Sequence, residues 1–410
     1  MKNKVVVLVI LLIVSGMVVL GYTYAVFTQQ NDALPEVHAQ PFWKYQCVDT
    51  MKSSRDRARE WINRPSYRAD IRRQMDIIAS LGANCVSIGT PYDEEFIPYL
   101  TSWVDAARDA GLHVWFRGNF AGWEGWFDYK RISDESTQHV AVAQFVRSHP
   151  DLFRDGDIFT SAPEAENGGP FQPGNSSQYE QYRNFLIDSY SECRNLFKEI
   201  QRDITCNWFS MSGGHAKSIF TKPSVIALDN VVTIDHYTRD SRDMGEYVDY
   251  FVKQYKAQVV IGEFGAPIPD LNGSMTEEEQ AVFVRHLFEE LLQRKDSVAG
   301  VNYWTLYEGS TRLLNEDYSE RLVAETTRDY FMPGTVVGRV TSVHEKSIAG
   351  AYVEVEGKKL GVTTDANGYF SLQLPAGEYA LTVSDFNKKV TSERFVLDRN
   401  ESYRVLLELR

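Results

Sequence analysis

The stretch VVIGEFGAP, from Val259 to Pro267, joins an apolar, β-branched run to one acidic side chain, and glycine and proline follow at once. Such a run is typical of a strand buried on both faces, as in a parallel sheet covered by helices. Glu263 would then lie where the strand ends. In a barrel of alternating strands and helices, that edge carries the catalytic residues, so this stretch predicts both a fold and a site.

Similar apolar stretches recur along the chain and alternate with segments of helical spacing. The helical segment after Met275 begins with Thr276 and three glutamates, which suit a helix N-terminus. Eight strand–helix units predict an α/β fold, a (β/α)8 TIM barrel, over residues 41–332. The expected strands are 41–49, 82–90, 110–119, 156–164, 203–210, 230–237, 258–265 and 299–307.

The pattern changes after Met332-Pro333-Gly334. From Thr335 to Arg410, short alternating segments are separated by turn residues, including Asp365 to Gly368 and Pro375 to Gly377. This pattern predicts a separate all-β sandwich domain over residues 335–410. We therefore expect two folded domains in a chain of 410 residues.

The N-terminus has Lys2 and Lys4 before an uncharged stretch from Val5 to Phe27. This length is enough to span a bilayer, and the basic end favours an anchor with the rest of the chain outside. We expect residues 1–30 to be a single-pass membrane anchor and 31–40 a linker. The alternative is a signal peptide cleaved before Val26 or Gln40, which would give a secreted protein.

Composition narrows the set of partners. The 43 basic and 56 acidic residues give a formal net charge of −13, which opposes binding to nucleic acid. A neutral or cationic substrate fits better, and we expect a monomer without metal or organic cofactor. The four cysteines, Cys47, Cys85, Cys193 and Cys206, have no metal-site spacing, and they could be buried thiols or disulfides.

A second carboxylate follows the fourth expected strand. Glu164 leaves that strand where Glu263 leaves the seventh, and the mouth of one barrel can hold both side chains close together. Two carboxyl groups about 5–5.5 Å apart cleave glycosidic bonds with retention, one as nucleophile and the other as acid/base. Glu166 is the rival acid/base, because sequence alone does not fix where the strand ends.

This arrangement resembles the clan of retaining glycoside hydrolases that includes family 5, the cellulases and mannanases. The resemblance covers residues 41–331. IGEFG is similar to that family's nucleophile motif and implies Glu263 as nucleophile. NYWTLYEG is similar to its eighth strand and implies that Trp304 forms the floor of the sugar-binding site. DHYTRD implies that Tyr237 hydrogen-bonds the nucleophile, with His236 or Asp235 lining the site.

The chain also departs from that family. Pro163 precedes Glu164 where the family has asparagine, so the amide expected to bind the sugar 2-hydroxyl is missing. The arginine that the clan places near the nucleophile has one candidate, Arg117 after the third strand, which could equally be a structural ion-pair partner. Trp208 and Trp123 could be sugar platforms or packing residues.

The sandwich segment is similar to carboxypeptidase regulatory-like, transthyretin-type domains, and without an evident catalytic set it favours a spacer or stabiliser over a carbohydrate binder. Taken together, the motifs predict a retaining glycoside hydrolase that acts on a β-linked poly- or oligosaccharide. The alternative is a catalytically inactive glycan-binding or adhesive surface protein, and Pro163 motivates it.

Overall fold

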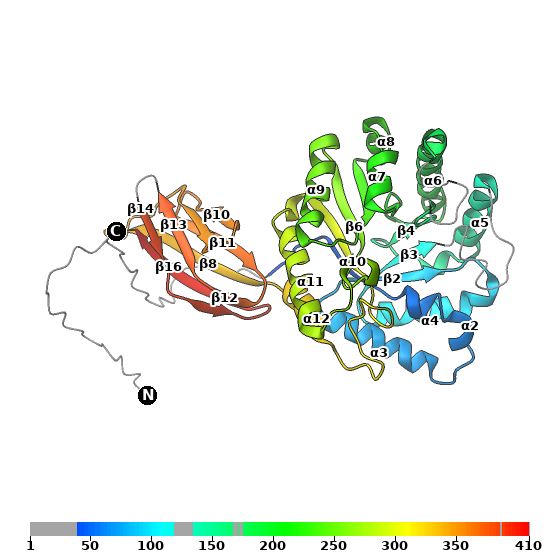
Figure 1. Cartoon of the computed structure of the whole chain (residues 1–410), viewed down its shortest axis with the longest axis horizontal. Helices are drawn as coiled ribbons and strands as arrows, with labels where there is room; N and C mark the ends of the chain where they lie inside the picture. Colours follow the sequence, from blue (N-terminus) through cyan, green and yellow to red (C-terminus); the bar gives the residue numbers. More distant parts are fainter. Residues whose placement is uncertain (1–38, 119–133, 167–170, 172–174, 386–387, 410) are drawn as a thin grey trace.

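The computed structural model describes residues 39–118, 134–166, 171, 175–385 and 388–409. A parallel sheet surrounded by helices forms one domain, and a smaller all-β domain lies beside it (Figure 1). The helices are α1 (Met51–Ser54), α2 (Ala58–Trp61), α3 (Tyr67–Ser80), α4 (Ile97–Asp109), α5 (Glu135–Ser148), α6 (Tyr179–Glu199), α7 (Gly213–Ile219), α8 (Lys222–Ala227), α9 (Ser241–Tyr255), α10 (Pro269–Asn272), α11 (Glu277–Leu292) and α12 (Leu322–Phe331).

The parallel sheet has the strand order β4-β3-β2-β1-β7-β6-β5. Its strands lie in seven of the expected stretches, and their side chains are almost entirely buried because helices cover the outside of the sheet. They are β1 (Tyr45–Asp49), β2 (Cys85–Thr90), β3 (His113–Gly118), β4 (Ile158–Thr160), β5 (Val231–Asp235), β6 (Gln258–Phe264) and β7 (Val298–Tyr303).

The fifth expected strand, 203–210, is not a regular strand. It pairs with β4 through an isolated parallel bridge at Thr205, and the segment after it pairs with β5 at Ser212. The Phe159 amide donates to the Thr205 carbonyl at 2.9 Å, and the Asp235 amide donates to the Met211 carbonyl at 2.8 Å. The segment thus lies between the two edge strands and closes the sheet into the predicted TIM barrel.

Local sequence explains how the helices begin. Thr276 accepts a hydrogen bond from the Glu279 amide, and the Glu279 side chain accepts one from the Thr276 amide. This capping box satisfies two amides that have no partner inside the helix. The prediction that α11 begins after Thr276 is confirmed.

The C-terminal domain is built from small sheets with the strand orders β10-β9-β13-β14, β11-β8-β16 and β12-β15. Its pairs are antiparallel except for β8 with β16, which run parallel. Inward-facing apolar side chains from these strands form a core separate from that of the barrel. The strands are β8 (Gly334–Ser342), β9 (Tyr352–Val355), β10 (Gly361–Thr363), β11 (Tyr369–Leu374), β12 (Gly377–Tyr379), β13 (Leu381–Asp385), β14 (Lys388–Thr391), β15 (Phe395–Leu397) and β16 (Ser402–Leu409).

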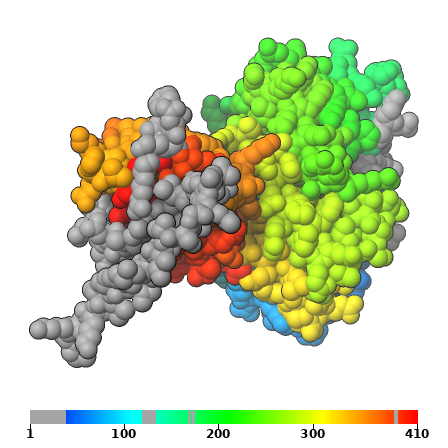
Figure 2. Space-filling view, turned by 60° about the vertical axis from the view of Figure 1, so that its left-hand side comes forward, coloured from blue at the N-terminus to red at the C-terminus, as the bar shows by residue number. Residues whose placement is uncertain are grey.

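Polar contacts join the two domains, which lie side by side in Figure 2. Lys358 forms an ion pair of 2.8 Å with Glu289 of α11. The Gln373 amide donates to the Gln40 carbonyl at 2.8 Å, and Gln40 precedes β1. The sandwich therefore contacts the barrel on the side where the parallel strands begin, away from the edge where they end.

All four cysteines are paired, so the disulfide alternative applies. Cys47 and Cys85 link the neighbouring strands β1 and β2, and Cys193 of α6 links to Cys206. Disulfides of this kind persist in exported proteins. No helix within the described ranges has both the length and the apolar character needed to cross a membrane. The expected anchor, Val5 to Phe27, lies outside those ranges.

Candidate active site

Charged side chains gather at the edge where the parallel strands end. Asp49 is the last residue of β1, Arg117 lies near the end of β3, Asp235 ends β5, and Glu263 lies near the end of β6. All four side chains are buried. Because parallel strands end on the same side of a barrel, these residues meet at one mouth.

The Glu263 carboxylate is held from two sides. Arg117 donates to Oε1 through Nη1, and the Tyr237 hydroxyl donates to Oε2 at 2.9 Å. Both contacts fix the orientation of the carboxylate. The structure thus brings three of the predicted site residues together.

The Arg117 guanidinium connects Glu263 to the rest of the network. Its Nη1 also donates to Asp49 Oδ2 at 3.0 Å, and Nη2 donates to the Ser210 hydroxyl at 3.2 Å. Burial alone would lower the arginine pKa, but the charges of Glu263, Asp49 and Asp235 raise it well above its ordinary value. Arg117 is therefore a permanent positive charge at the centre of the carboxyl groups.

Glu164 faces this cluster from the turn that follows β4. Its backbone has φ of 48°, in the left-handed region that non-glycine residues rarely adopt, and its amide donates to the Ser210 carbonyl at 2.9 Å. One carboxyl oxygen from each of Glu164, Asp235 and Glu263 lies within 4.8 Å of the other two. Burial, and then the charge of Glu263, raise the pKa of Glu164 to about 8.

The two glycines of the GEFG motif make room for the site. A Cβ on Gly262 would lie 2.4 Å from Asp235 Oδ1, and a Cβ on Gly265 would lie 2.4 Å from the Trp304 carbonyl oxygen. Neither approach is possible for a residue with a side chain unless its neighbour moves. The opening motif therefore encodes close packing around Glu263 as well as the carboxylate itself.

Trp304 follows β7 and is half-buried. Its amide donates to the Phe264 carbonyl at 2.9 Å, which ties its backbone to the strand that carries Glu263. The Lys52 ammonium lies 5.8 Å from the centre of its ring. An aromatic face that is partly open beside the carboxyl cluster can stack on a sugar ring.

Glu166 lies outside the carboxyl cluster. Its Oε2 accepts from the Tyr182 hydroxyl at 2.8 Å, and its Oε1 accepts from the Ser212 amide at 2.9 Å. The His215 ring is 3.8 Å from Oε1, and this contact raises the histidine pKa. Of the two glutamates after β4, the structure places Glu164 beside Glu263 and gives Glu166 hydrogen-bond partners of its own.

Two of the predicted substrate-binding residues point elsewhere. The His236 ring packs on Tyr247 with 3.8 Å between ring centres, and burial, together with the charge of Lys217, lowers its pKa to about 4. Successive side chains of an extended chain point to opposite sides, so Asp235 and Tyr237 face the mouth and His236 faces the helices. Of the alternatives His236 and Asp235, the structure favours Asp235.

Trp208 is also not a rim residue. Its side chain is only 3% exposed and packs inside the barrel against Tyr45 and Trp115, with ring centres 5.3 and 5.0 Å away. A Cβ on Gly300 would lie 2.5 Å from the indole, so that glycine makes space for it. The sugar-platform prediction for Trp208 is wrong because the ring points down into the barrel. Trp123 lies outside the described residues.

The cluster of Glu164, Asp235 and Glu263 has the spacing of a cation site. Arg117 already contacts Glu263, and its Nη2 lies 3.7 Å from Asp235 Oδ2. A cation between these carboxylates would meet a fixed positive charge at short range. The donor set therefore suits proton chemistry better than metal binding.

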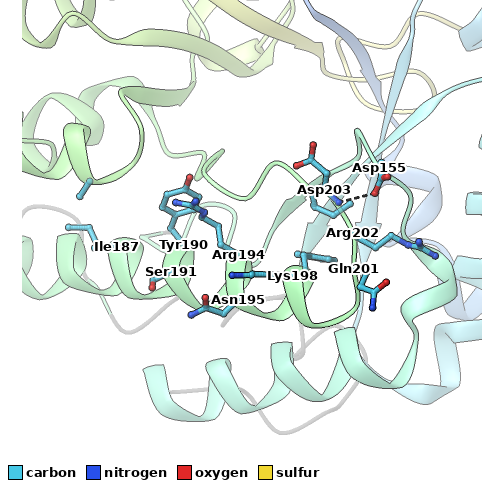
Figure 3. A pocket seen from close by; sticks show the side chains of 13 residues that line it. Asp155, Ile187, Tyr190, Ser191, Arg194, Asn195, Lys198, Gln201, Arg202 and Asp203 are labelled. Atoms are coloured by element: carbon cyan, nitrogen blue, oxygen red, sulfur yellow. Dashed lines mark hydrogen bonds between the residues drawn. The ribbon is translucent and has the colours of Figure 1, made fainter.

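A separate hollow, of about 800 Å³, lies on the outside of the barrel along α6 (Figure 3). Asp155 and Asp203 border it, and both precede the segments that enter the barrel. Tyr190 and Arg194 line it from α6, and Arg194 lies 4.0 Å from Asp229. None of the residues that carry the carboxyl cluster borders this hollow, so we place the candidate site at the mouth.

Comparisons with known proteins agree with this architecture. A family model for the carboxypeptidase regulatory-like domain matches residues 335–410. No curated protein matches the sequence significantly. A solved fungal β-1,4-galactanase structure aligns with a TM-score of 0.51 at 13% identity, over 70% of this chain and 99% of that chain.

Two other solved structures are more distant. A family 5 xyloglucanase from Paenibacillus pabuli aligns at TM-score 0.49 and 12% identity, over 63% of this chain and 90% of that one. A family 1 β-glucosidase from Thermotoga maritima aligns with a TM-score of 0.47 at 10% identity, over 72% of this chain and 98% of that chain. The galactanase match shows a shared fold and no more. The chain thus joins a TIM barrel, the fold that it shares with the galactanase, to a C-terminal domain that matches the carboxypeptidase regulatory-like model.

Proposed function

We propose that this protein is a retaining glycoside hydrolase that cleaves β-glycosidic bonds in a poly- or oligosaccharide. The observation that carries the proposal is the pair of Glu164 and Glu263 at the mouth of the barrel, where one carboxyl oxygen of each lies within 4.8 Å of the other. Retaining enzymes hold their two carboxyl groups about 5–5.5 Å apart, whereas inverting enzymes need about 6.5–9.5 Å to admit a water molecule. The spacing here favours double displacement.

In the first step, a Glu263 oxygen attacks the anomeric carbon while Glu164 gives its proton to the leaving glycosidic oxygen. The raised pKa of Glu164 keeps that proton available at neutral pH. Arg117 and Tyr237 hold the Glu263 carboxylate for attack. The bond to the leaving sugar breaks as the glycosyl–Glu263 ester forms.

In the second step, Glu164 is ionised and takes a proton from water. The water oxygen attacks the anomeric carbon, and the bond to Glu263 breaks. Two inversions give net retention, and both glutamates return to their starting states. Every proton and electron pair is accounted for by the two carboxyl groups and water.

The stereochemistry of the first product tests the proposal. Aryl β-glycosides with good leaving groups should be turned over, and proton NMR should show the β-anomer before mutarotation. Early appearance of the α-anomer would contradict double displacement. Glycan binding without turnover would favour the inactive binding protein, the alternative that Pro163 suggests.

The pH profile follows from the pKa of Glu164, which is raised to about 8. The first step needs the protonated form, which is lost as the pH rises through that value. For a substrate with a poor leaving group, kcat/KM should hold through neutral pH and then fall tenfold per pH unit above about 8. A dinitrophenyl glycoside needs no proton, so its profile should lack this limb. If kcat/KM falls at the same basic pH for both substrates, the fall reports the titration of a group other than Glu164.

We also propose that the protein acts as a monomer on carbohydrate outside the cell, held by residues 1–30 in the membrane. The uncharged stretch from Val5 to Phe27 and the two disulfides support this location. Fractionation of expressing cells should recover the protein with the membrane. Soluble protein that begins at Val26 or Gln40 would show instead that the segment is a cleaved signal.

A further inference from the structure

Asp235 is a buried carboxyl group that the two catalytic roles do not use. It is 5% exposed, and neither of its oxygens forms a hydrogen bond of ordinary geometry within the described residues, although the Ser210 hydroxyl lies near enough to lower its pKa. The nearby Arg117 Nη2 is 3.7 Å from Oδ2, beyond hydrogen-bond distance. A buried polar group without a partner is costly, so its presence at the mouth needs an explanation.

The position of Asp235 points to the substrate. One of its oxygens lies within 4.8 Å of carboxyl oxygens of both Glu164 and Glu263. On the proposed function, the anomeric carbon must sit between those two glutamates during cleavage. A group one or two bonds away from that carbon is then within hydrogen-bond reach of Asp235.

Apart from the glycosidic oxygen, which receives the proton of Glu164, two groups there can form hydrogen bonds: the ring oxygen and the C2 hydroxyl. Positive charge develops on the anomeric carbon and the ring oxygen in the oxocarbenium-like transition state. A carboxyl proton donated to the ring oxygen would oppose that charge. The C2 hydroxyl carries no such charge, and hydrogen bonds to it strengthen in the transition state.

The local protein environment also suits a neutral, hydrogen-bonding carboxyl group. Burial, and then the charge of Glu263, raise the pKa of Asp235 well above its usual range, and Arg117 only partly offsets this. A protonated Asp235 can both donate to and accept from a hydroxyl group. Pro163, next to Glu164, has no polar side-chain atom to serve instead.

We propose that Asp235 binds the C2 hydroxyl of the sugar whose anomeric carbon is attacked by Glu263. This inference rests on the proposed function and names a specificity-determining residue of that site. It implies a substrate with a free hydroxyl at C2 of that sugar.

The test compares 2,4-dinitrophenyl β-D-glucoside with its 2-deoxy analogue. For Asp235→Ala, kcat/KM should fall about 10²–10³-fold on the 2-hydroxy substrate, the loss typical of one transition-state hydrogen bond. On the 2-deoxy substrate the loss should be less than about tenfold, because the bond is already absent there. Equal losses on both substrates would overturn the proposal.

Asp235→Asn is the matched conservative variant. Its side-chain amide also donates and accepts hydrogen bonds, so this variant should keep most of the activity on the 2-hydroxy substrate. A loss of kcat/KM as large as that of Asp235→Ala would contradict a neutral hydrogen-bonding role. Asp235→Asn keeps the shape of the side chain, and Asp235 forms no hydrogen bond of ordinary geometry to any described residue, so this variant should melt close to the wild-type temperature. Glu263→Ala in the same assay separates the two claims: if it retains activity, or if wild type turns over no aryl β-glycoside, the proposed function itself fails.

Discussion

Replacing Glu263 by alanine is expected to lower kcat/KM on every substrate by about 10⁴-fold or more, because it removes the nucleophile that forms the glycosyl–enzyme ester. Sodium azide should restore turnover by occupying the space that the carboxylate leaves. The glycosyl azide product should have the inverted, α configuration, since only one displacement then takes place. Mass spectrometry and proton NMR of the product measure this directly.

The fold should tolerate this substitution. Arg117 keeps its contact with Asp49 at 3.0 Å when Glu263 is removed, so its charge is not left without a partner. Circular dichroism should therefore match the wild type. An azide product with retained configuration would show that Glu263 is not the nucleophile, even if activity is low.

Replacing Glu164 by alanine is expected to separate substrates by their leaving groups. Natural linkages, which need protonation, should lose about 10²–10⁴-fold in kcat/KM. A dinitrophenyl glycoside should still form the glycosyl–enzyme rapidly, and the slow hydrolysis of that intermediate should produce a burst in pre-steady-state kinetics. Azide should accelerate this second step and give a product of retained, β configuration.

Glu166→Ala is the matched control, because it removes a carboxylate two residues away on the same turn. Glu166 accepts hydrogen bonds from Tyr182 and the Ser212 amide, so its loss should affect stability more than leaving-group dependence. If Glu166→Ala shows the burst and the retained azide product while Glu164→Ala resembles wild type, the acid/base assignment belongs to Glu166.

The strands of the barrel could be predicted because their sequences are continuous and apolar. QVVIGEF and CVSIGT became β6 and β2, since a strand covered on both sides tolerates few polar residues. The stretch 203–210 was predicted in the same way, but it forms only isolated bridges with its neighbours. Pairing depends on the path of the neighbouring strands, which its own residues do not encode.

Side-chain direction at the strand ends was harder to predict. Trp208 is an aromatic residue in an expected barrel strand, which suits a sugar platform, yet its indole packs in the barrel interior beside Tyr45. The backbone around Trp208 is irregular, so the alternation of side chains along a strand does not predict which way the indole points. The pairing of the cysteines was also open, because Cys47 and Cys85 are separated by 38 residues and meet only when β1 and β2 lie side by side.

The amino-acid sequence by itself determined the order of strands and helices, the change to a β domain after Gly334, and the presence of glutamates at the ends of two barrel strands. These features depend on local composition and spacing, which a short window of sequence contains. Only the tertiary structure decided that Glu164 rather than Glu166 faces Glu263, that Arg117 binds Glu263, and that Asp235 lies beside them. Those relations join residues from different strands, and barrel closure brings them within a few ångströms of one another.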